Sequence, residues 1–407
     1  MGIKGWIIVV FLALTAVRFL LQLIQYRSAK NPIPENVKDV YDNETYLKWQ
    51  EYHGELSRLG FIEELVSAAL MVALLLSNAH AAVSGLLGQN GSNPFIAVIL
   101  FQALVEVLFA LPFRYVSVMK IEEKYGFNRS TVKTFVKDQI IGFIMGFGLN
   151  CFFVLAIYAC HDLLGDGMAI LLSVILCLFL LIANLVSPLF RRIHNKFTPL
   201  PEGSLRDKLT ALLSRHGYRV KAIEVMDASR RTSKSNAYFS GLGKQKRIVL
   251  FDTLLEAMDE DEICAVFAHE LGHGLHHDIP RLLFMSCVNM VFISLFSWLV
   301  VREPSICQAF GFEDVNYGFA FLILGLIALP LFAQIWGLLS NAISRRAEYA
   351  ADAQAVKEGY GEALVSGLKK LSRENFAHLS PSKVLVVLGY SHPPLSQRIE
   401  AIEAAQK

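Results

Sequence analysis

The chain has 407 residues, of which 54% are hydrophobic and only 18% are charged, and its mean hydropathy is +0.43. Soluble chains carry a larger charged fraction, so this composition indicates an integral membrane protein. The formal net charge is only +2, and no basic cluster is interleaved with aromatic residues, so we expect no nucleic-acid partner. The six cysteines form no CxxC pair and are interpreted as packing residues.

Seven windows are apolar and long enough to cross the hydrocarbon layer of a bilayer. They lie near residues 5–25, 61–83, 94–117, 138–160, 167–190, 282–301 and 317–340. The first is interpreted as a retained span rather than a signal peptide, because its apolar run is too long and Arg18 interrupts it. We therefore expect membrane helices one to five in residues 1–190 and helices six and seven in 281–340, with polar segments at 191–280 and 341–407.

The distribution of lysine and arginine predicts the orientation of these spans, because positively charged loops stay on the cytoplasmic side. Loops 26–60 and 118–137 carry five such residues each, and segments 191–280 and 341–407 are rich in them, whereas loops 84–93 and 161–166 carry none. Seven spans with the N-terminus outside or luminal and the C-terminus cytoplasmic fit every loop. The membrane itself, a bacterial inner membrane or the endoplasmic reticulum, stays open.

The polar segment 191–280 has a mixed pattern of strands and helix. The stretches RVKAIEVMD, SNAYFSG and KRIVLFD, which begin at residues 219, 235 and 246, have the composition of short strands. They predict a small three-stranded sheet, in which the segment around Asn236 and Ala237 is an exposed edge. The following stretch, DEDEICAVFAHELGHGLHH, has helical spacing and acids in its first turn, where the helix dipole favours them.

The HELGH motif on this helix indicates a zinc site. His269 and His273 are four residues apart, so a helix presents both imidazoles on one face. Glu270 is next to the first histidine and is predicted to act as the catalytic base, as in HExxH zinc proteases. His276 and His277 are interpreted as histidines of the helix end. Gly272 is expected to allow the neighbouring backbone or the substrate to approach closely.

A third metal ligand must come from another direction, because His276 lies on the same helix as the first two. The stretch NAISRRAEYAAD follows the last span, and four polar residues in it, Asn341, Arg345, Glu348 and Asp352, recur at helical spacing. We predict Glu348 as the third ligand and Asp352 as the acceptor for a ligand N–H. Arg345 is expected to support this site. The alternative for the segment is a solvated charged helix.

Polar residues inside the predicted spans are costly against lipid and normally face a bundle interior or water. They are Arg18, Gln102, Glu106, Asn150, Asn184, Asn289 and Gln334. Together they favour a wet interior, although hydrogen bonding between helices explains any single one equally well.

Several motifs together resemble the integral-membrane CaaX prenyl endopeptidases, the type I zinc proteases that trim isoprenylated tails. They are HELGH at 269–273, SRRAEYAAD at 344–352, SNAYFSG at 235–241, RIVLFDTLL at 247–255, EEKYGFNRST at 122–131 and HPPLSQRI at 392–399. The resemblance implies seven membrane helices around a water-filled chamber, capped by an α+β zinc metalloprotease domain. It implies one zinc held by His269, His273 and Glu348, with Glu270 as base. Asn236 and Ala237 would align the substrate, and His392 and Arg398 would lie near the reaction centre.

The function predicted from this pattern is a membrane-embedded zinc endopeptidase whose substrate is a peptide or a membrane-associated protein, with or without a prenyl group. One alternative is a general quality-control protease similar to the heat-shock membrane zinc proteases, which share the histidine and acid motifs on fewer spans. Another is a channel or transporter with a structural zinc. Structural zinc sites are usually closed and rich in thiolates, whereas two histidines and one glutamate leave a position open.

Overall fold

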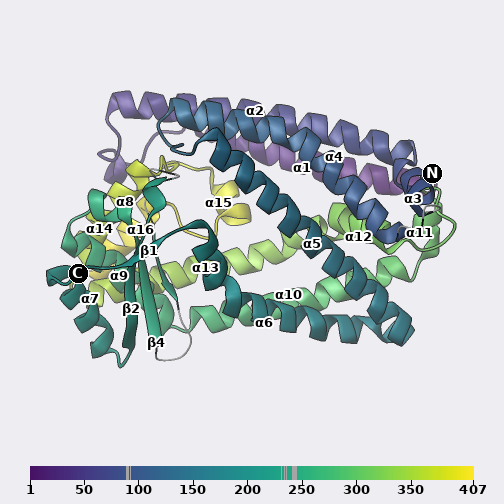
Figure 1. The fold of residues 1–407 in the computed structure, drawn as a ribbon. Helices are drawn as coiled ribbons and strands as arrows, with labels where there is room; N and C mark the ends of the chain where they lie inside the picture. The colour runs from purple at the N-terminus through teal and green to yellow at the C-terminus, as the bar shows by residue number, and fades with distance from the viewer. Residues whose placement is uncertain (89–90, 92, 231, 233, 235, 241–244) are drawn as a thin grey trace.

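The computed structural model describes the whole chain except residues 89–90, 92, 231, 233, 235 and 241–244. Long helices form most of it, and Figure 1 places the N-terminus at one end of them and the C-terminus, with the sheet, at the other. The elements of the N-terminal half are α1 (Ile3–Ser28), η1 (Glu35–Val37), α2 (Asn43–Leu76), α3 (Ala79–Gly88), α4 (Pro94–Val116), η2 (Ser117–Glu122), α5 (Val132–Leu164), η3 (Gly165–Gly167) and α6 (Met168–His194).

The C-terminal half alternates small elements with two further long helices. Its sheet-bearing part holds β1 (Phe197–Pro199), α7 (Ser204–Arg215), β2 (Arg219–Met226), η4 (Ala228–Arg230), β3 (Ala237–Ser240), β4 (Gln245–Phe251) and α8 (Asp252–Ala257). The remainder is α9 (Glu260–Leu275), α10 (Asp278–Val301), α11 (Pro304–Gln308), α12 (Tyr317–Ile323), η5 (Leu324–Ala328), α13 (Leu329–Lys357), α14 (Gly361–Glu374), α15 (Lys383–Gly389) and α16 (Leu395–Ala405).

Among the described residues, six segments are long and apolar enough to cross a membrane, which confirms a multi-pass membrane protein. One of them, Val132–Val186, comprises α5 and most of α6, which pack against each other after the η3 turn. The predicted windows 138–160 and 167–190 therefore correspond to two separate helices. The total of seven spans stays a prediction.

The second predicted window, 61–83, extends beyond the end of the helix that it describes. Helix α2 ends at Leu76, and Asn78 adopts a left-handed conformation with φ of 57° before α3 starts at Ala79. Asparagine tolerates this conformation better than most residues, so the chain can turn there although both sides are apolar. A hydropathy window averages over such a break and cannot detect it.

The last predicted span contains an irregular helical turn shortly before its proline. Helix α12 passes through a π-helical turn, η5, into α13, and Pro330 is in the first turn of α13. A π turn widens the helix locally, and proline has no N–H to bond to the preceding turn, so the two features are compatible. Helix α13 then continues well past residue 340, into the polar segment.

The sheet has four strands in the order β1-β2-β4-β3, so the prediction of three strands is wrong by one. The additional strand is β1, three residues that pair antiparallel with β2. It contains Pro199, which is tolerated on an edge strand because proline has no N–H to donate. Strands β2 and β4 are parallel, and β3 pairs antiparallel with β4, which leaves β3 at the other edge, as predicted.

Helix α9 packs between the sheet-bearing part and the helices that follow it in the chain. It contacts α7, β3, α10, α13 and α14. Residues Ile263 to Ala268 are all buried, within a core that includes Leu250 of β4, Leu364 of α14 and Ile399 of α16. Burial of each such leucine or isoleucine stabilises the fold by roughly 1.5–3 kcal/mol, so the position of α9 is fixed from several sides.

Three of the polar residues in the membrane helices, Arg18, Gln102 and Glu106, pair with other side chains. Arg18 of α1 donates to Glu64 of α2 at 2.9 Å. Gln102 of α4 is buried and bonds both to His80 of α3, at 3.0 Å, and to Glu106, at 2.9 Å. For these residues the structure favours hydrogen bonding between helices over the lining of a wet interior.

Candidate metal centre and active site

Helix α9 starts with a capping box, which fixes the register of the residues that follow. The Asp259 side chain accepts from the backbone N–H of Glu262 at 2.9 Å, and the Glu262 side chain accepts from the backbone N–H of Asp259 at 3.0 Å. Glu262 is buried and also binds Lys370 at 2.6 Å. Further along the same helix, His269 and His273 lie on one face with ring centroids 4.8 Å apart.

The third member of the cluster comes from α13. The Glu348 carboxylate is buried, and its two oxygens lie 3.5 Å from His269 Nε2 and 3.4 Å from His273 Nε2. One ligand atom from each of the three residues can be chosen so that all lie within 4.8 Å of one another. Two imidazoles and a carboxylate from two helices therefore converge on one point, as the spacing of the two motifs predicted.

Each histidine is oriented by its own carboxylate. His269 Nδ1 donates to Asp352 at 2.8 Å, and His273 Nδ1 donates to Asp278 at 3.0 Å. With the proton held on Nδ1, each neutral ring presents the lone pair of Nε2 to Glu348. Such carboxylate–histidine pairs are typical of metal ligands, because they set the tautomer and raise the basicity of the ring.

The donor set fits a bound cation. Nε2 lone pairs and carboxylate oxygens repel one another unless positive charge lies between them, and Glu348 Oε2 is buried without a hydrogen-bond partner. The pKa of His273 also indicates that this site favours a positive charge. Burial lowers it, but the bonds to Glu348 and Asp278 outweigh burial and raise the pKa to about 9 in the absence of a metal. Two nitrogens and one carboxylate match catalytic zinc sites.

Arg398 of α16 contacts the carboxylates that surround His269. Its guanidinium binds Asp352 through two bonds, Nε to Oδ2 at 2.9 Å and Nη2 to Oδ1 at 2.6 Å. Nη1 lies 3.5 Å from Glu348 Oε2. The side chain is only 12% exposed. Arg398 thus holds the carboxylate that orients His269, and its charge compensates a site that contains several buried acids.

His392 lies at the open side of the cluster. Its Nε2 is 3.2 Å from Glu348 Oε1, and its side chain is 67% exposed. Ser391 Oγ lies 2.9 Å from His392 Nδ1. When that hydroxyl donates, the neutral ring carries its proton on Nε2, facing the centre. Arg345 of α13 holds the preceding segment by donating to the carbonyl oxygens of Val386 and Tyr390, at 2.9 and 2.7 Å.

A cavity of about 390 Å³ opens in front of the cluster. Glu270, His273, Glu348 and His392 are in its wall, and burial raises the pKa of Glu270. Within the described part of the chain, no side chain donates a hydrogen bond to Glu270. Its carboxylate is therefore free to bind a water or a substrate proton. Leu282, Ile343 and Ala347 provide an apolar wall.

Asn236 and Ala237 are at the start of β3, the edge strand that contacts α9. Asn236 is exposed, its side-chain oxygen accepts from Ala237 N–H at 2.8 Å, and its carbonyl accepts from Phe251 N–H at 3.1 Å. The outer edge of β3 has no partner strand among the described residues. An extended peptide could pair there by strand addition.

Sequence reasoning missed two features of this site. Asp278, the partner of His273, is the first residue of α10, and the signal for it was an acid immediately after the end of the HELGH helix. The apolar wall was also missed, because Leu282 and Ile343 belong to stretches that hydropathy assigns to membrane helices or their ends. His276 and His277 lie at the junction of α9 and α10, as predicted for histidines of a helix end.

Gly272 sets the distance between the two helices that carry the ligands. A Cβ atom at this position would lie 2.8 Å from the Cα of Ala351 and 3.1 Å from the Cβ of Gln354. We expect Gly272→Val to separate α9 from α13, to reduce bound metal and to lower the melting temperature. Gly142→Val in α5 is the control, because a Cβ atom there would meet no neighbouring atom within 4 Å. Equal metal content in the two variants would contradict this role.

The sequence profile of peptidase family M48 matches residues 199–406, and that of the CAAX prenyl protease N-terminal region, described as five membrane helices, matches residues 5–192. A rice protein named CAAX prenyl protease 1 homolog is 33% identical over 95% of this chain and 93% of its own length. The Arabidopsis thaliana protein of that name is 33% identical over 100% of this chain and 97% of its own. The crystal structure of Saccharomyces mikatae Ste24p aligns with a TM-score of 0.91 at 25% identity, covering 99% of each chain.

A histidine pair, an adjacent glutamate and a facing carboxylate, held on helices that run into a membrane bundle, define the class of membrane-embedded metalloproteases. Both matching profiles and the full-length similarity place the chain within that class. The chain belongs to the CAAX prenyl protease 1 family of M48 peptidases. This assignment favours an enzyme over the transporter interpretation.

Proposed function

We propose that this protein is a zinc endopeptidase that hydrolyses peptide bonds in the C-terminal tails of isoprenylated membrane-associated proteins. The observation that carries the proposal is the convergence of His269, His273 and Glu348 on one point, with Glu270 free beside them. The names of the relatives in rice and Arabidopsis support the substrate class. The full-length match argues against the heat-shock type of membrane protease, which the sequence left as the alternative.

His269, His273 and Glu348 would hold one zinc ion per chain. When bound there, zinc would supply a Lewis acid that makes water more acidic and polarises a carbonyl. Glu270 accepts the proton of the attacking water and returns it to the amine that leaves. His392 donates from Nε2 to the carbonyl oxygen as negative charge develops on it. Asp352, Asp278 and Arg398 keep the two imidazoles in the required orientation.

The substrate would lie as an extended strand beside β3. Backbone hydrogen bonds to the free edge near Asn236 and Ala237 fix its register, and an aliphatic side chain would be placed against Leu282 and Ile343. This mode needs no folded recognition domain in the substrate, which suits a short flexible tail. A prenyl group would hold that tail at the membrane, where α10 and α13 lead directly to the metal centre.

The test is cleavage of a synthetic farnesylated CaaX peptide by the purified full-length protein. We expect one zinc per chain, loss of cleavage after chelation and recovery on addition of zinc. Asn236→Ala should lower turnover and keep the zinc. A zinc-replete protein that cleaves neither this peptide nor its non-prenylated counterpart would contradict the proposed function, and equal cleavage of the two would remove the prenyl requirement.

We propose further that the N-terminus is outside or luminal and that the metal centre faces the cytoplasm. The loop charges support this orientation, and Figure 1 places the N-terminus and the sheet at opposite ends of the helices. Single cysteines that replace Asp166 and Ser204 in a cysteine-free background should react with an impermeant thiol reagent from opposite sides. Reaction from the same side would overturn the orientation.

A further inference from the structure

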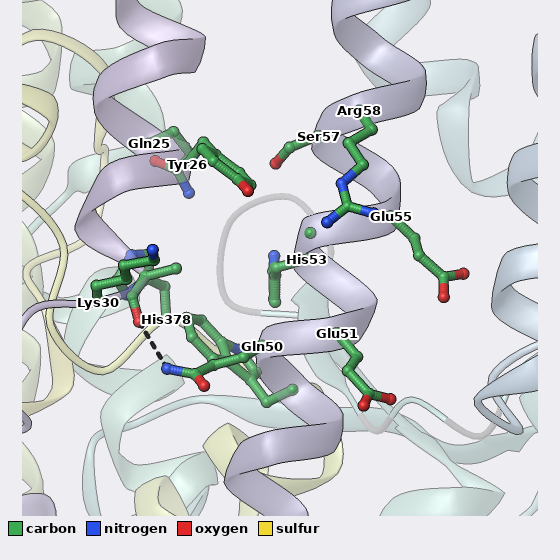
Figure 2. A pocket seen from close by; sticks show the side chains of 13 residues that line it. Gln25, Tyr26, Lys30, Gln50, Glu51, His53, Glu55, Ser57, Arg58 and His378 are labelled. Atoms are coloured by element: carbon green, nitrogen blue, oxygen red, sulfur yellow. Dashed lines mark hydrogen bonds between the residues drawn. The ribbon is translucent and has the colours of Figure 1, made fainter.

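A second cavity, of about 490 Å³, lies between the end of α1 and the first half of α2 (Figure 2). It shares no lining residue with the cavity at the metal centre. Its lining includes Tyr26, Lys30, Trp49, His53, Arg58 and His378. The proposed peptidase mechanism uses none of these residues.

The cavity is at the boundary between the apolar and the polar parts of both helices. On α2, Ile62 and Leu65 are 55% and 58% exposed and begin four residues after Arg58, a rise of about 6 Å. On α1, Leu20 is also 55% exposed, six residues before Tyr26. Tyrosine and tryptophan are enriched at this level of a membrane, and lysine and arginine on its cytoplasmic side. The cavity therefore lies at the height of lipid headgroups.

Hydrogen-bond donors point into the space between the two helices, and the two acids that also line the cavity, Glu51 and Glu55, extend to its side. In Figure 2 the guanidinium of Arg58 turns toward His53, and the Tyr26 and Ser57 hydroxyls point into the same space between the helices. The side chains of Glu51 and Glu55 extend from the opposite side of α2. Such an arrangement presents the guanidinium of Arg58 and two hydroxyl groups to whatever occupies the space.

The cations at the cavity make no ion pair with a described side chain, although Arg58 interacts electrostatically with Glu55. Glu55, the nearest acid in sequence, is bound to Lys124 at 2.5 Å and to the Tyr125 hydroxyl at 3.2 Å. Neither Arg58 nor Lys30 makes an ion pair with a described side chain, and both are exposed. His378 adds no charge, because burial and the nearby His53 lower its pKa to about 4.

The floor of the cavity is rigid. Trp49 is buried, donates from Nε1 to the carbonyl of Phe376 at 3.0 Å and packs against the His53 and His378 rings. His378 Nε2 bonds to Ser28 of α1 at 2.8 Å, and its Nδ1 accepts from the Ser380 N–H at 3.2 Å. The donors at the cavity thus project from a fixed frame formed by α1, α2 and the segment before α15.

We infer that this cavity binds the phosphate group of an anionic phospholipid. A guanidinium binds a phosphate through two parallel bonds, and hydroxyl groups and a second cation complete the coordination. Basic pockets between membrane helices on the cytoplasmic side are the usual sites of anionic headgroups. A zwitterionic headgroup fits less well, because its choline would lie next to Arg58 and Lys30.

The experiment measures the melting temperature of the full-length, zinc-loaded protein in a neutral detergent. The probes are dioctanoyl phosphatidic acid, dioctanoyl phosphatidylcholine and inorganic phosphate, each titrated separately. We expect saturable stabilisation by phosphatidic acid, and much weaker effects of the other two at equal concentration. Arg58→Gln and Lys30→Gln should each raise the apparent dissociation constant for phosphatidic acid at least tenfold.

The matched control is Arg27→Gln, which removes the same charge from the last turn of α1 outside the cavity lining. It should bind phosphatidic acid within about twofold of the unmodified protein. Equal effects of Arg27→Gln and Arg58→Gln would overturn the site. Equal stabilisation by phosphatidylcholine would overturn the need for a negative headgroup, and equal stabilisation by inorganic phosphate would overturn a lipid as the ligand. Should Arg58→Gln fail to fold, Lys30→Gln decides alone.

Discussion

Replacement of Glu270 by glutamine is expected to lower peptidase turnover on the order of a thousandfold, the range for loss of a general base, while zinc stays bound. Glutamine keeps the size of the side chain but cannot accept a proton. Glu270 makes no hydrogen bond to a described side chain, and the ligand atoms come from His269, His273 and Glu348, so the substitution leaves the metal cluster intact. The measurements are turnover of the farnesylated peptide and zinc per chain.

Two further variants serve as controls for this result. His273→Ala removes a ligand atom and should lose zinc and activity together. Glu260→Gln makes the same chemical change in the first turn of the same helix, where the side chain binds Ser204 and Lys208, and should keep both zinc and activity. If Glu270→Gln retained more than about a tenth of the normal turnover, Glu270 could not be the base.

The convergence of His269, His273 and Glu348 can be predicted from the sequence because each of the two motifs lies on one helix. Spacing of four residues places His269 and His273 on one face, and the same rule aligns Glu348 with Asp352 on α13. The sequence cannot show that the two helices cross at Gly272. That contact depends on tertiary packing, although the glycine in HELGH was interpreted as a point of close approach.

The architecture is less accessible to sequence reasoning where polarity changes within a single helix. The predicted boundaries at residues 190, 280 and 340 all fall inside helices α6, α10 and α13. Hydropathy changes at these points because the surroundings change from membrane to water, while the backbone hydrogen bonds continue. The helix that crosses the bilayer therefore also carries Glu348, which couples the metal centre to the membrane bundle.

Strand β1 and the end of α2 were predicted incorrectly for a related reason. A strand of three residues that contains proline has no periodic pattern, and its pairing with β2 is a long-range contact. The turn at Asn78 depends on one left-handed residue within an apolar run. In both places a single residue and its tertiary contacts outweigh the average over a window.

His392→Ala is expected to lower the catalytic rate by roughly a hundredfold, the usual effect of losing one hydrogen-bond donor to a developing oxyanion. Zinc content should stay normal, because His392 contributes no atom to the ligand cluster. Its Nε2 lies 3.2 Å from Glu348 Oε1. The Michaelis constant should also change little, because the bond strengthens only in the transition state. A variant with a raised Michaelis constant and an unchanged rate would make His392 a binding residue.

Arg398 is expected to act through Asp352 and not on the substrate, and this separates it from His392. Arg398→Ala should release the carboxylate that orients His269, so both zinc affinity and rate should fall, by about 10- to 100-fold in affinity, as for other partners of metal-ligating histidines. Arg398→Lys should not restore either property, because an ammonium group cannot reproduce the two bonds to Asp352 at 2.9 and 2.6 Å. Asp352→Asn should produce the same loss of zinc affinity, and the double variant should be no worse than either single one. Full rescue by lysine would show that Arg398 supplies only charge.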